Sequence, residues 1–358
     1  MENDFWKVPG KQQEDSRIDH LLFERYLKKK KSFLANLPFN YTAIPPKIRT
    51  RMFDVFLKFK KDPGFPKWPT DFTVEKLRRE WLKKQGKVSY LGFWPSGYEG
   101  AVCLTHDCDT ESSFKAIKRV REIEKEYGFK SCWNFVPHKY KINFEMLKWL
   151  EKEGCEIGIH GFDHTGKIAY EDRQTIKKKL DYVKEKFKEF EIKGFRSALL
   201  QRNEEFLRQL QHHFDYDSSV PDTDIYSPKA FRNGACTAFP FFIGKMIELP
   251  LTMPQDWRLI RMKLSTEKMM EVWKVKINDI LRVNGMININ MHPDDFISGN
   301  EKYLKVYEEL IKEISERKKL WKALPKEIAE WWRERDQAEI VKNKVKGSKR
   351  AKIISNAP

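Results

Sequence analysis

From Ala101 to about residue 332, short apolar runs alternate with longer amphipathic segments. The apolar runs predict strands at 102–105, 131–135, 155–159, 194–196, 247–251, 286–291 and 321–324. The segments between them repeat apolar residues at helical spacing, which predicts helices at about 112–127, 144–153, 171–190, 204–210, 266–283, 300–317 and 325–332. Strand–helix units of this length, about seven or eight in number, predict a parallel sheet that closes into a barrel.

The first 97 residues have a different pattern. Residues 17–39 can form a basic amphipathic helix, proline-rich turns follow at 44–46 and 63–69, and a second helix is predicted at about 73–84. We expect residues 1–97 to be a helical extension packed on a barrel of residues 98–337. A membrane-surface or partner-binding element is the alternative. Residues 338–358 are polar and basic, and we expect a disordered tail there.

The composition indicates a folded chain without a membrane span. Hydrophobic residues make up 40% and charged residues 34% of the 358 positions, so the chain can bury a core. No run approaches the roughly 18 apolar residues of a membrane span, and the N-terminus lacks the apolar core of a signal peptide. The five cysteines include no CxxC pair and are typical of a reducing compartment. We therefore expect a cytoplasmic protein, with peripheral contact to a membrane surface left open.

The net charge of +17 (69 Lys+Arg minus 52 Asp+Glu) favours anionic partners. Nucleic acid, an anionic membrane surface and a phosphorylated or anionic sugar all fit this charge. The sequence contains no helix-turn-helix, zinc-finger, RNP or Walker pattern, and its basic residues are spread along helical faces. We therefore expect no specific nucleic-acid partner.

Two short polar clusters stand where predicted strands end. Asp107 and Asp109 follow the first strand, and His160 and His164 follow the third. An isolated Asp-x-Asp is usually a turn or a helix cap, and an isolated His-x-x-x-His is similarly weak. Together they offer three N/O metal ligands with one open position, the usual layout of a catalytic zinc site, and leave one carboxylate over as a base.

Two more polar residues stand at strand ends. Arg196 ends the fourth strand, and His292 follows the strand at 286–291. Because parallel strands of a barrel end at one rim, these residues are expected to meet the two polar clusters there. Arg196 could instead be a structural ion-pair partner, and His292 a rim histidine bonded to backbone.

Residues 91–333 resemble the polysaccharide deacetylase superfamily (NodB-like, carbohydrate esterase family 4) in these motifs. The resemblance implies a distorted (β/α)7-type barrel. It also implies that Asp107 is the catalytic base and that Asp109, His160 and His164 are the metal ligands.

The same resemblance implies that Arg196 orients the base and that His292 is the general acid. Ala198 stands where the family's Arg-x-Pro motif has proline. The fourth motif is poorly resolved, with Asp217 and Asp222 as candidates and no clear Asp-Trp pair.

These residues predict a metal-dependent hydrolase that cleaves a non-peptide C–N amide bond. The expected reaction is N-deacetylation of an acetamido sugar or glycan precursor, lipid-linked or nucleotide-linked, whose phosphates would suit the basic surface. Zinc is the expected metal, although Co²⁺, Ni²⁺ or Fe²⁺ would suit the same ligands. The alternatives are an allantoinase-like hydrolase of small amides on the same fold, and a non-catalytic glycan- or membrane-binding protein on a decayed deacetylase scaffold. Ala198 alone supports the last.

Overall fold

The computed structural model describes residues 5–11, 44, 48, 51–52, 55, 72–223 and 234–355. The helix expected at 17–39, the turn at 63–69 and residues 45–46 of the other turn lie outside these residues. The helix expected at 73–84 is present as α4 (Thr73–Lys84).

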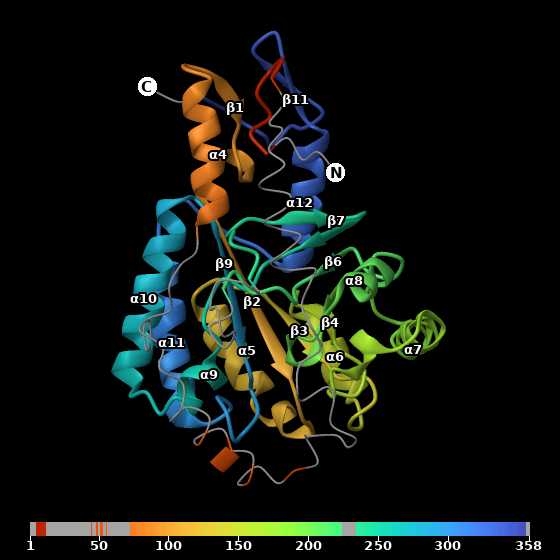
Figure 1. Cartoon of the computed structure of the whole chain (residues 1–358). Helices are drawn as coiled ribbons and strands as arrows, with labels where there is room; N and C mark the ends of the chain where they lie inside the picture. Colours follow the sequence, from red (N-terminus) through yellow and green to blue (C-terminus); the bar gives the residue numbers. More distant parts are fainter. Residues whose placement is uncertain are drawn as a thin grey trace.

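A curled, mainly parallel sheet forms the centre of the molecule (Figure 1). Its strands are β2 (Gly100–Cys108), β3 (Ser131–Phe135), β4 (Glu156–His160), β5 (Gly194–Arg196), β6 (Tyr216–Asp217), β7 (Phe241–Ile243), β8 (Met246–Glu248), β9 (Met286–Met291) and β10 (Leu320–Lys322). Their order is β10-β2-β3-β4-β5-β6-β8-β7, and β9 pairs with β2. Every pair is parallel except the β7–β8 hairpin, so the predicted parallel sheet is confirmed.

The gap between β8 and β9 is closed mainly by side chains and not by a regular ladder. The Thr252 hydroxyl donates to the Met286 carbonyl oxygen at 2.7 Å and accepts from the Asn288 amide at 2.9 Å. The side-chain amide of Asn288 donates to the carbonyl oxygens of Leu249 and Pro250, at 3.2 and 3.1 Å. These bonds tie the chain that follows β8 to β9 and give a distorted barrel.

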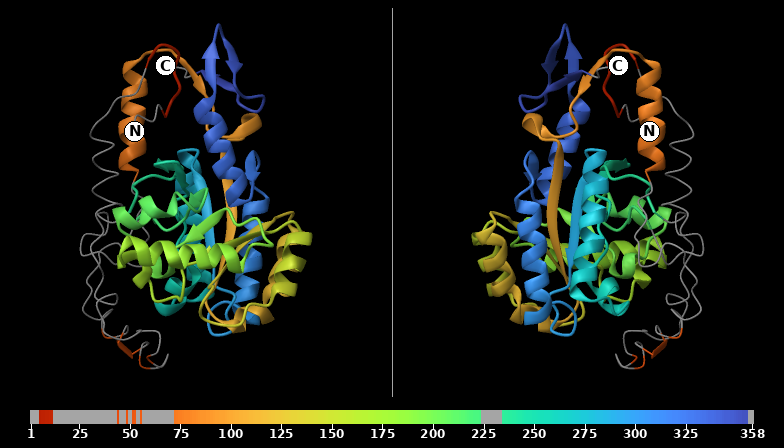
Figure 2. Two further views of the ribbon diagram at one scale, coloured as in Figure 1. Left: turned by 90° about the vertical axis from the view of Figure 1, so that its right-hand side faces the viewer. Right: turned by 90° about the vertical axis from the view of Figure 1, so that its left-hand side faces the viewer.

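Helices cover the outer face of the sheet, as the two side views in Figure 2 show. They are α5 (Ile117–Glu126), α6 (Phe144–Lys152), α7 (Arg173–Lys186), α8 (Glu204–Leu210), α9 (Asp256–Arg261), α10 (Thr266–Arg282) and α11 (Glu301–Ser315). A further helix, α12 (Pro325–Gln337), packs at the end of the barrel where the strands begin. Shorter 3-10 turns are η3 (Pro95–Gly97), η4 (Glu111–Lys115), η5 (Lys167–Tyr170) and η6 (Ala198–Leu200). Side chains of Asn143, Asn203 and Asn300 cap α6, α8 and α11. None of the described helices is long and apolar enough to cross a bilayer.

Alternation along β2 decides which side chains face the barrel interior. Val102 and Leu104 pack in the main core under the helices, whereas Ala101 and Cys103 belong to a second core inside the barrel. Because successive strand residues point to opposite faces, Asp107 has the inward orientation of Ala101 and Cys103. The buried strand thereby delivers a carboxylate to the rim where β2 ends.

The second core fills the end of the barrel where the strands begin, and the N-terminal residues Phe5 and Trp6 are part of it. The Phe5 ring lies 4.9 Å from the ring of Phe93 and 5.1 Å from that of Phe239. The Arg78 guanidinium lies 3.7 Å from the Phe5 ring centre. Phe5 and Trp6 therefore pack on the barrel, although the boundary proposed at residue 97 stays a prediction.

We expect Phe5→Ala to lower the free energy of unfolding by about 3 kcal/mol, because it leaves a cavity among buried aromatic rings. Urea denaturation measures the change. Phe296→Ala is the matched control, since Phe296 is 61% exposed and its loss should cost less than about 0.5 kcal/mol. Equal effects of the two variants would contradict the packing role of Phe5.

The C-terminal segment is ordered through residue 355, contrary to the disorder expected for 338–358. β11 (Glu339–Val341) and β12 (Lys344–Lys346) form a hairpin, and β13 (Ile353–Ser355) pairs with β1 (Ser89–Leu91). Figure 2 shows the hairpin projecting from one end of the molecule. The physical reason is burial: Ala338, Ile340 and Ala351 join the second core, which a composition dominated by lysine did not reveal.

Candidate metal centre and its surroundings

All six residues predicted for the site lie together where the parallel strands end. Asp107 is the next-to-last residue of β2, His160 ends β4 and Arg196 ends β5. His292 follows β9 directly, and its ring Nε2 lies 3.9 Å from Asp107 Oδ2. This rim is at the lower end of the barrel in Figure 1, where the β2 arrow points.

Asp109, His160 and His164 each offer one atom to a common point, and these three atoms lie within 4.8 Å of one another. Asp109 Oδ1 is 3.3 Å from His160 Nε2 and 2.9 Å from His164 Nε2. Asp109 Oδ1 is buried and has no hydrogen-bond partner. A buried carboxylate oxygen facing two imidazole nitrogens is the donor set that a zinc-class ion takes, so these residues fit a metal.

Local backbone geometry aims both histidines. Nδ1 of His160 lies 3.1 Å from the Arg196 carbonyl oxygen, which fixes Nδ1 as the donor and leaves the Nε2 lone pair for a metal. His164 adopts a left-handed conformation with φ of 63°, which costs about 1–2 kcal/mol for a residue with a side chain. The Asp163 carboxylate holds this turn by accepting from the Thr165 amide at 2.9 Å.

The electrostatics favour the protonation states that a metal requires. Burial raises the pKa of Asp109, but the charge of His164 and the contact with His160 outweigh it, so the pKa lies well below the usual range. Burial lowers the pKa of His164, with Asp109 acting in the opposite direction. The charge of His164 acts on Asp109 while that imidazole is protonated. At neutral pH the lowered pKa of His164 favours the neutral imidazole that a metal binds, beside an ionised Asp109.

Asp107 accepts hydrogen bonds from Arg196, Asn134 and Asn290 and is not part of the metal cluster. Arg196 Nη1 donates to its Oδ1 at 3.0 Å, and the same guanidinium donates to Thr105 Oγ1 and the Ser218 carbonyl oxygen, both at 2.9 Å. Burial raises the pKa of Asp107, but the charge of Arg196, followed by those of two histidines, brings it well below the usual range. Asp107 is therefore an ionised carboxylate with a fixed orientation.

His292 is clamped by Asp256, which the sequence analysis missed. Asp256 Oδ1 lies 2.6 Å from His292 Nδ1, and Oδ2 accepts from the His292 backbone amide at 2.7 Å. Burial lowers the pKa of His292, but the charge of the Asp256 carboxylate and its hydrogen bond more than offset this effect, and the pKa is raised to about 10. Asp256 is followed by Trp257, so the sequence does contain an Asp-Trp pair, outside the 217–222 segment that held the candidates for the fourth motif.

Asp217 and Asp222, the earlier candidates for this motif, are engaged elsewhere. Asp217 is fully buried and accepts from the Ser219 hydroxyl at 2.7 Å. Asp222 forms a buried ion pair with Lys276. Both carboxylates satisfy buried charge and polar groups, so neither takes the position that Asp256 occupies beside His292.

Asp294 fixes the backbone that carries Asp109. Its Oδ2 accepts from the Asp109 amide at 3.2 Å, and its Oδ1 accepts from the Thr110 amide at 2.9 Å. We expect Asp294→Ala to weaken zinc binding about 10- to 100-fold, since it releases the loop that carries a ligand. Calorimetric titration measures this. Asp295→Ala, which removes only an exposed ion pair with Lys115, should leave the affinity unchanged; a matching loss there would contradict the prediction.

Ala198, where the sequence departs from Arg-x-Pro, packs against the metal loop. Ala198 is buried, and a Cβ placed on Gly161 would lie 3.0 Å from the Cβ of Ala198. Gly161 has φ of 67°, so a side chain there would also be strained. Ala198 therefore packs closely against the residue that follows His160.

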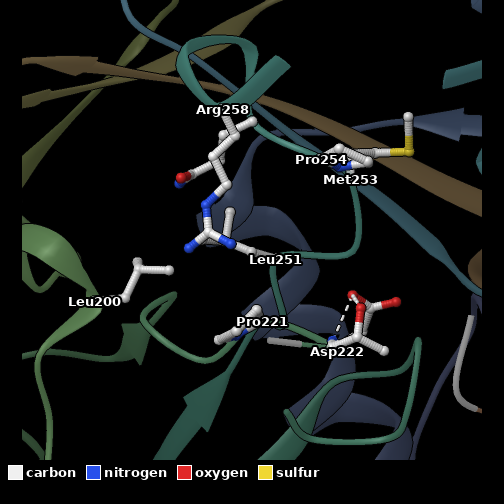
Figure 3. A pocket seen from close by; sticks show the side chains of 9 residues that line it. Leu200, Pro221, Asp222, Leu251, Met253, Pro254 and Arg258 are labelled. Atoms are coloured by element: carbon white, nitrogen blue, oxygen red, sulfur yellow. Dashed lines mark hydrogen bonds between the residues drawn. The ribbon is translucent and has the colours of Figure 1, made fainter. Parts of the chain in front are cut away.

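A cavity opens beside α9, as Figure 3 shows. It is small, about 20 Å³, and its walls mix apolar and polar residues: Leu200, Pro221, Asp222, Thr223, Leu251, Met253, Pro254, Gln255 and Arg258. Arg258 reaches into it from α9 toward Leu251 (Figure 3). Because Gln255 directly precedes Asp256, the cavity adjoins the clamp on His292.

The sequence matches no protein-family model and gives no significant match among curated proteins. Solved structures resemble it in fold. A protein of Mycobacterium smegmatis assigned as a polysaccharide deacetylase has a TM-score of 0.55 at 21% identity, covering 68% of this chain and 93% of that one. Puue allantoinase has a TM-score of 0.54 at 14% identity, covering 67% and 92%.

A protein of Pseudomonas aeruginosa PAO1 with the same deacetylase assignment has a TM-score of 0.54 at 15% identity, covering 67% of this chain and 93% of that one. At these identities the likeness concerns the fold. The chain has the NodB-like fold of the polysaccharide deacetylases, as its motifs predicted.

Proposed function

We propose that this protein is a metal-dependent hydrolase that cleaves a non-peptide C–N amide bond, and that it removes the N-acetyl group of an acetamido sugar or glycan precursor. The observation that carries the proposal is the space around Asp107 Oδ2. This atom lies 3.9 Å from both His160 Nε2 and His292 Nε2. A candidate base thus stands between the metal cluster and a candidate acid.

Asp109, His160 and His164 would hold the ion, with zinc expected and Co²⁺, Ni²⁺ or Fe²⁺ compatible with the same ligands. A bound ion would supply positive charge that polarises the amide carbonyl and acidifies water. Side chains of the protein would carry out the proton transfers of the reaction.

Asp107 is the proposed base. Its Oδ2 would take a proton from the attacking water, because it is ionised and aims at the space beside the metal ligands. The guanidinium of Arg196 binds the other oxygen, Oδ1, and keeps the carboxylate ionised and correctly turned.

His292 is the proposed acid. Its raised pKa keeps the imidazole protonated at neutral pH, and Asp256 leaves Nε2 as the nitrogen that faces Asp107. Nε2–H can therefore donate to the departing nitrogen as the C–N bond breaks. The two roles need groups of opposite protonation state, and the two environments supply them.

The charge of the chain supports an anionic substrate. The net charge of +17 would attract phosphates of a lipid-linked or nucleotide-linked sugar.

Hydrolysis of a small amide is the second candidate function. It is favoured by the TM-score of 0.54 with an allantoinase, which equals that with one of the proteins assigned as deacetylases. The same base, acid and metal ligands would serve either reaction, so the substrate alone separates them.

A substrate panel tests the proposal. Zinc-loaded protein is incubated with nucleotide-linked and lipid-linked N-acetyl amino sugars, free N-acetyl amino sugars and allantoin, and released acetate and consumed allantoin are measured. Acetate from an acetamido sugar supports deacetylation. Consumption of allantoin alone selects the second candidate, and no turnover of any member by metal-loaded protein would contradict the hydrolase proposal.

A further inference from the structure

Two buried asparagines flank Asp107 on the neighbouring strands. β2 lies between β3 and β9, and in the β2–β3 register Asp107 stands opposite Asn134. Asn134 Nδ2 donates to Asp107 Oδ1 at 2.9 Å, and Asn290 Nδ2 donates to Oδ2 at 2.7 Å. With Arg196, the two amides give one carboxylate three donors from three different strands.

The amide orientations are fixed by contacts at their other ends. Asn134 Oδ1 accepts from Cys132 Sγ at 3.4 Å, and Asn290 Oδ1 lies 3.4 Å from the Thr105 hydroxyl. Both residues are almost fully buried, with 4% and 2% of their surface exposed for Asn134 and Asn290. Their NH₂ groups therefore point at Asp107 and have no solvent alternative.

Asp109, only two residues away, has the opposite environment. Its Oδ1 faces His160 and His164 and receives no hydrogen bond. A carboxylate oxygen without a donor can bind a cation directly, whereas a carboxylate with three buried donors must give some of them up to do so. The hydrogen bonds thus distinguish Asp107 from Asp109.

We propose that Asn134 and Asn290 are positioning residues that hold Asp107 away from the metal, so that it stays a base and does not become a fourth protein ligand. The inference rests on the metal centre of the proposed function and adds to it. A catalytic zinc site keeps one position open for water or substrate, whereas four protein ligands make a closed, structural site.

The distances show why restraint is needed. Asp107 Oδ2 is 3.9 Å from His160 Nε2, a nitrogen that would itself touch the ion. Metal–ligand bonds of about 2 Å place the ion within reach of a turned Asp107 carboxylate. Within the part of the chain that the structure describes, the hydrogen bonds that oppose this rotation come from Asn134, Asn290 and Arg196.

The test uses Co²⁺ as a spectroscopic probe and azide as a small anion that binds an open metal position. Chelator-stripped full-length protein is loaded with Co²⁺, and the change of its visible absorption spectrum is followed as azide is added. The variants are Asn134→Leu and Asn290→Leu, with Asn290→Ser to be used if the leucine variant does not fold.

Asn288→Leu is the matched control. Asn288 is buried on the same strand as Asn290, but its amide bonds to Ser218, Leu249 and Pro250 and not to Asp107. It reports what the loss of any buried amide in β9 does to the site.

We expect the wild-type protein and Asn288→Leu to show the same azide response. In the Asn134 and Asn290 variants we expect azide to bind at least about 10-fold more weakly, with a Co²⁺ spectrum altered before azide is added. An unchanged response in these variants, or an equal loss in Asn288→Leu, overturns the positioning role while the metal centre stands. No Co²⁺ binding by the wild-type protein overturns the metal centre and this inference with it.

Discussion

Asp107→Asn is expected to reduce amide hydrolysis by about 10³-fold while the protein still binds zinc. The amide side chain keeps the shape of the carboxylate but cannot accept the proton of the attacking water. Asp107 is outside the cluster of Asp109, His160 and His164, so the ligand set stays intact. Substitution of Asp107 is therefore expected to affect turnover, whereas substitution of Asp109 is expected to affect metal content.

Turnover and zinc content of the same preparation measure this. Asp295→Asn is the control, because Asp295 is an exposed carboxylate whose ion pair, among the described residues, is with Lys115. Loss of zinc together with activity in Asp107→Asn would instead make Asp107 a metal ligand. Retained turnover would remove it from the mechanism.

Asp256→Asn is expected to lower turnover by about 10²- to 10³-fold and to change its pH dependence. Asp256 raises the pKa of His292 to about 10 against the effect of burial. The proton needed for the leaving group is present below the pKa of His292 and is lost as the pH rises through it. Without the Asp256 charge, burial still lowers this pKa while the charges of Asp109 and Asp107 still raise it, so the pKa falls from about 10 toward its ordinary value of about 6.5.

The basic limb of the kcat/KM profile should accordingly move to lower pH in Asp256→Asn. A bound metal ion would repel the imidazolium and shift the basic limb to lower pH in both proteins. The quantity to compare is therefore the difference in pH between the basic limbs of the variant and the wild-type protein. An unchanged limb in the variant would show that His292 is not the acid whose protonation the reaction requires.

The sequence predicted the functional residues that lie at the ends of buried strands. The apolar run before Asp107 and the one before His160 placed both clusters on one rim, because parallel strands end together. The alternation of β2 also determined that Asp107 faces inward.

The residues that orient the site were harder to predict. Asp256 begins the short helix α9 after a segment without clear periodicity, so no strand end marked it. Asn134 and Asn290 lie within strands and read as ordinary polar positions in apolar runs. Their role depends on register between strands, and one sequence does not specify register. The ordered C-terminal segment was missed because a few buried residues, such as Ile340, outweigh its many lysines.

The most direct test of the account is a calorimetric titration of zinc into chelator-stripped protein, beside Asp109→Ala and His160→Ala. The account predicts one tight site in the wild-type protein and its loss in both variants, since each removes one of three ligands. Folded wild-type protein without a specific zinc site, or with a site that survives both substitutions, would contradict the metal centre on which the proposed hydrolysis depends.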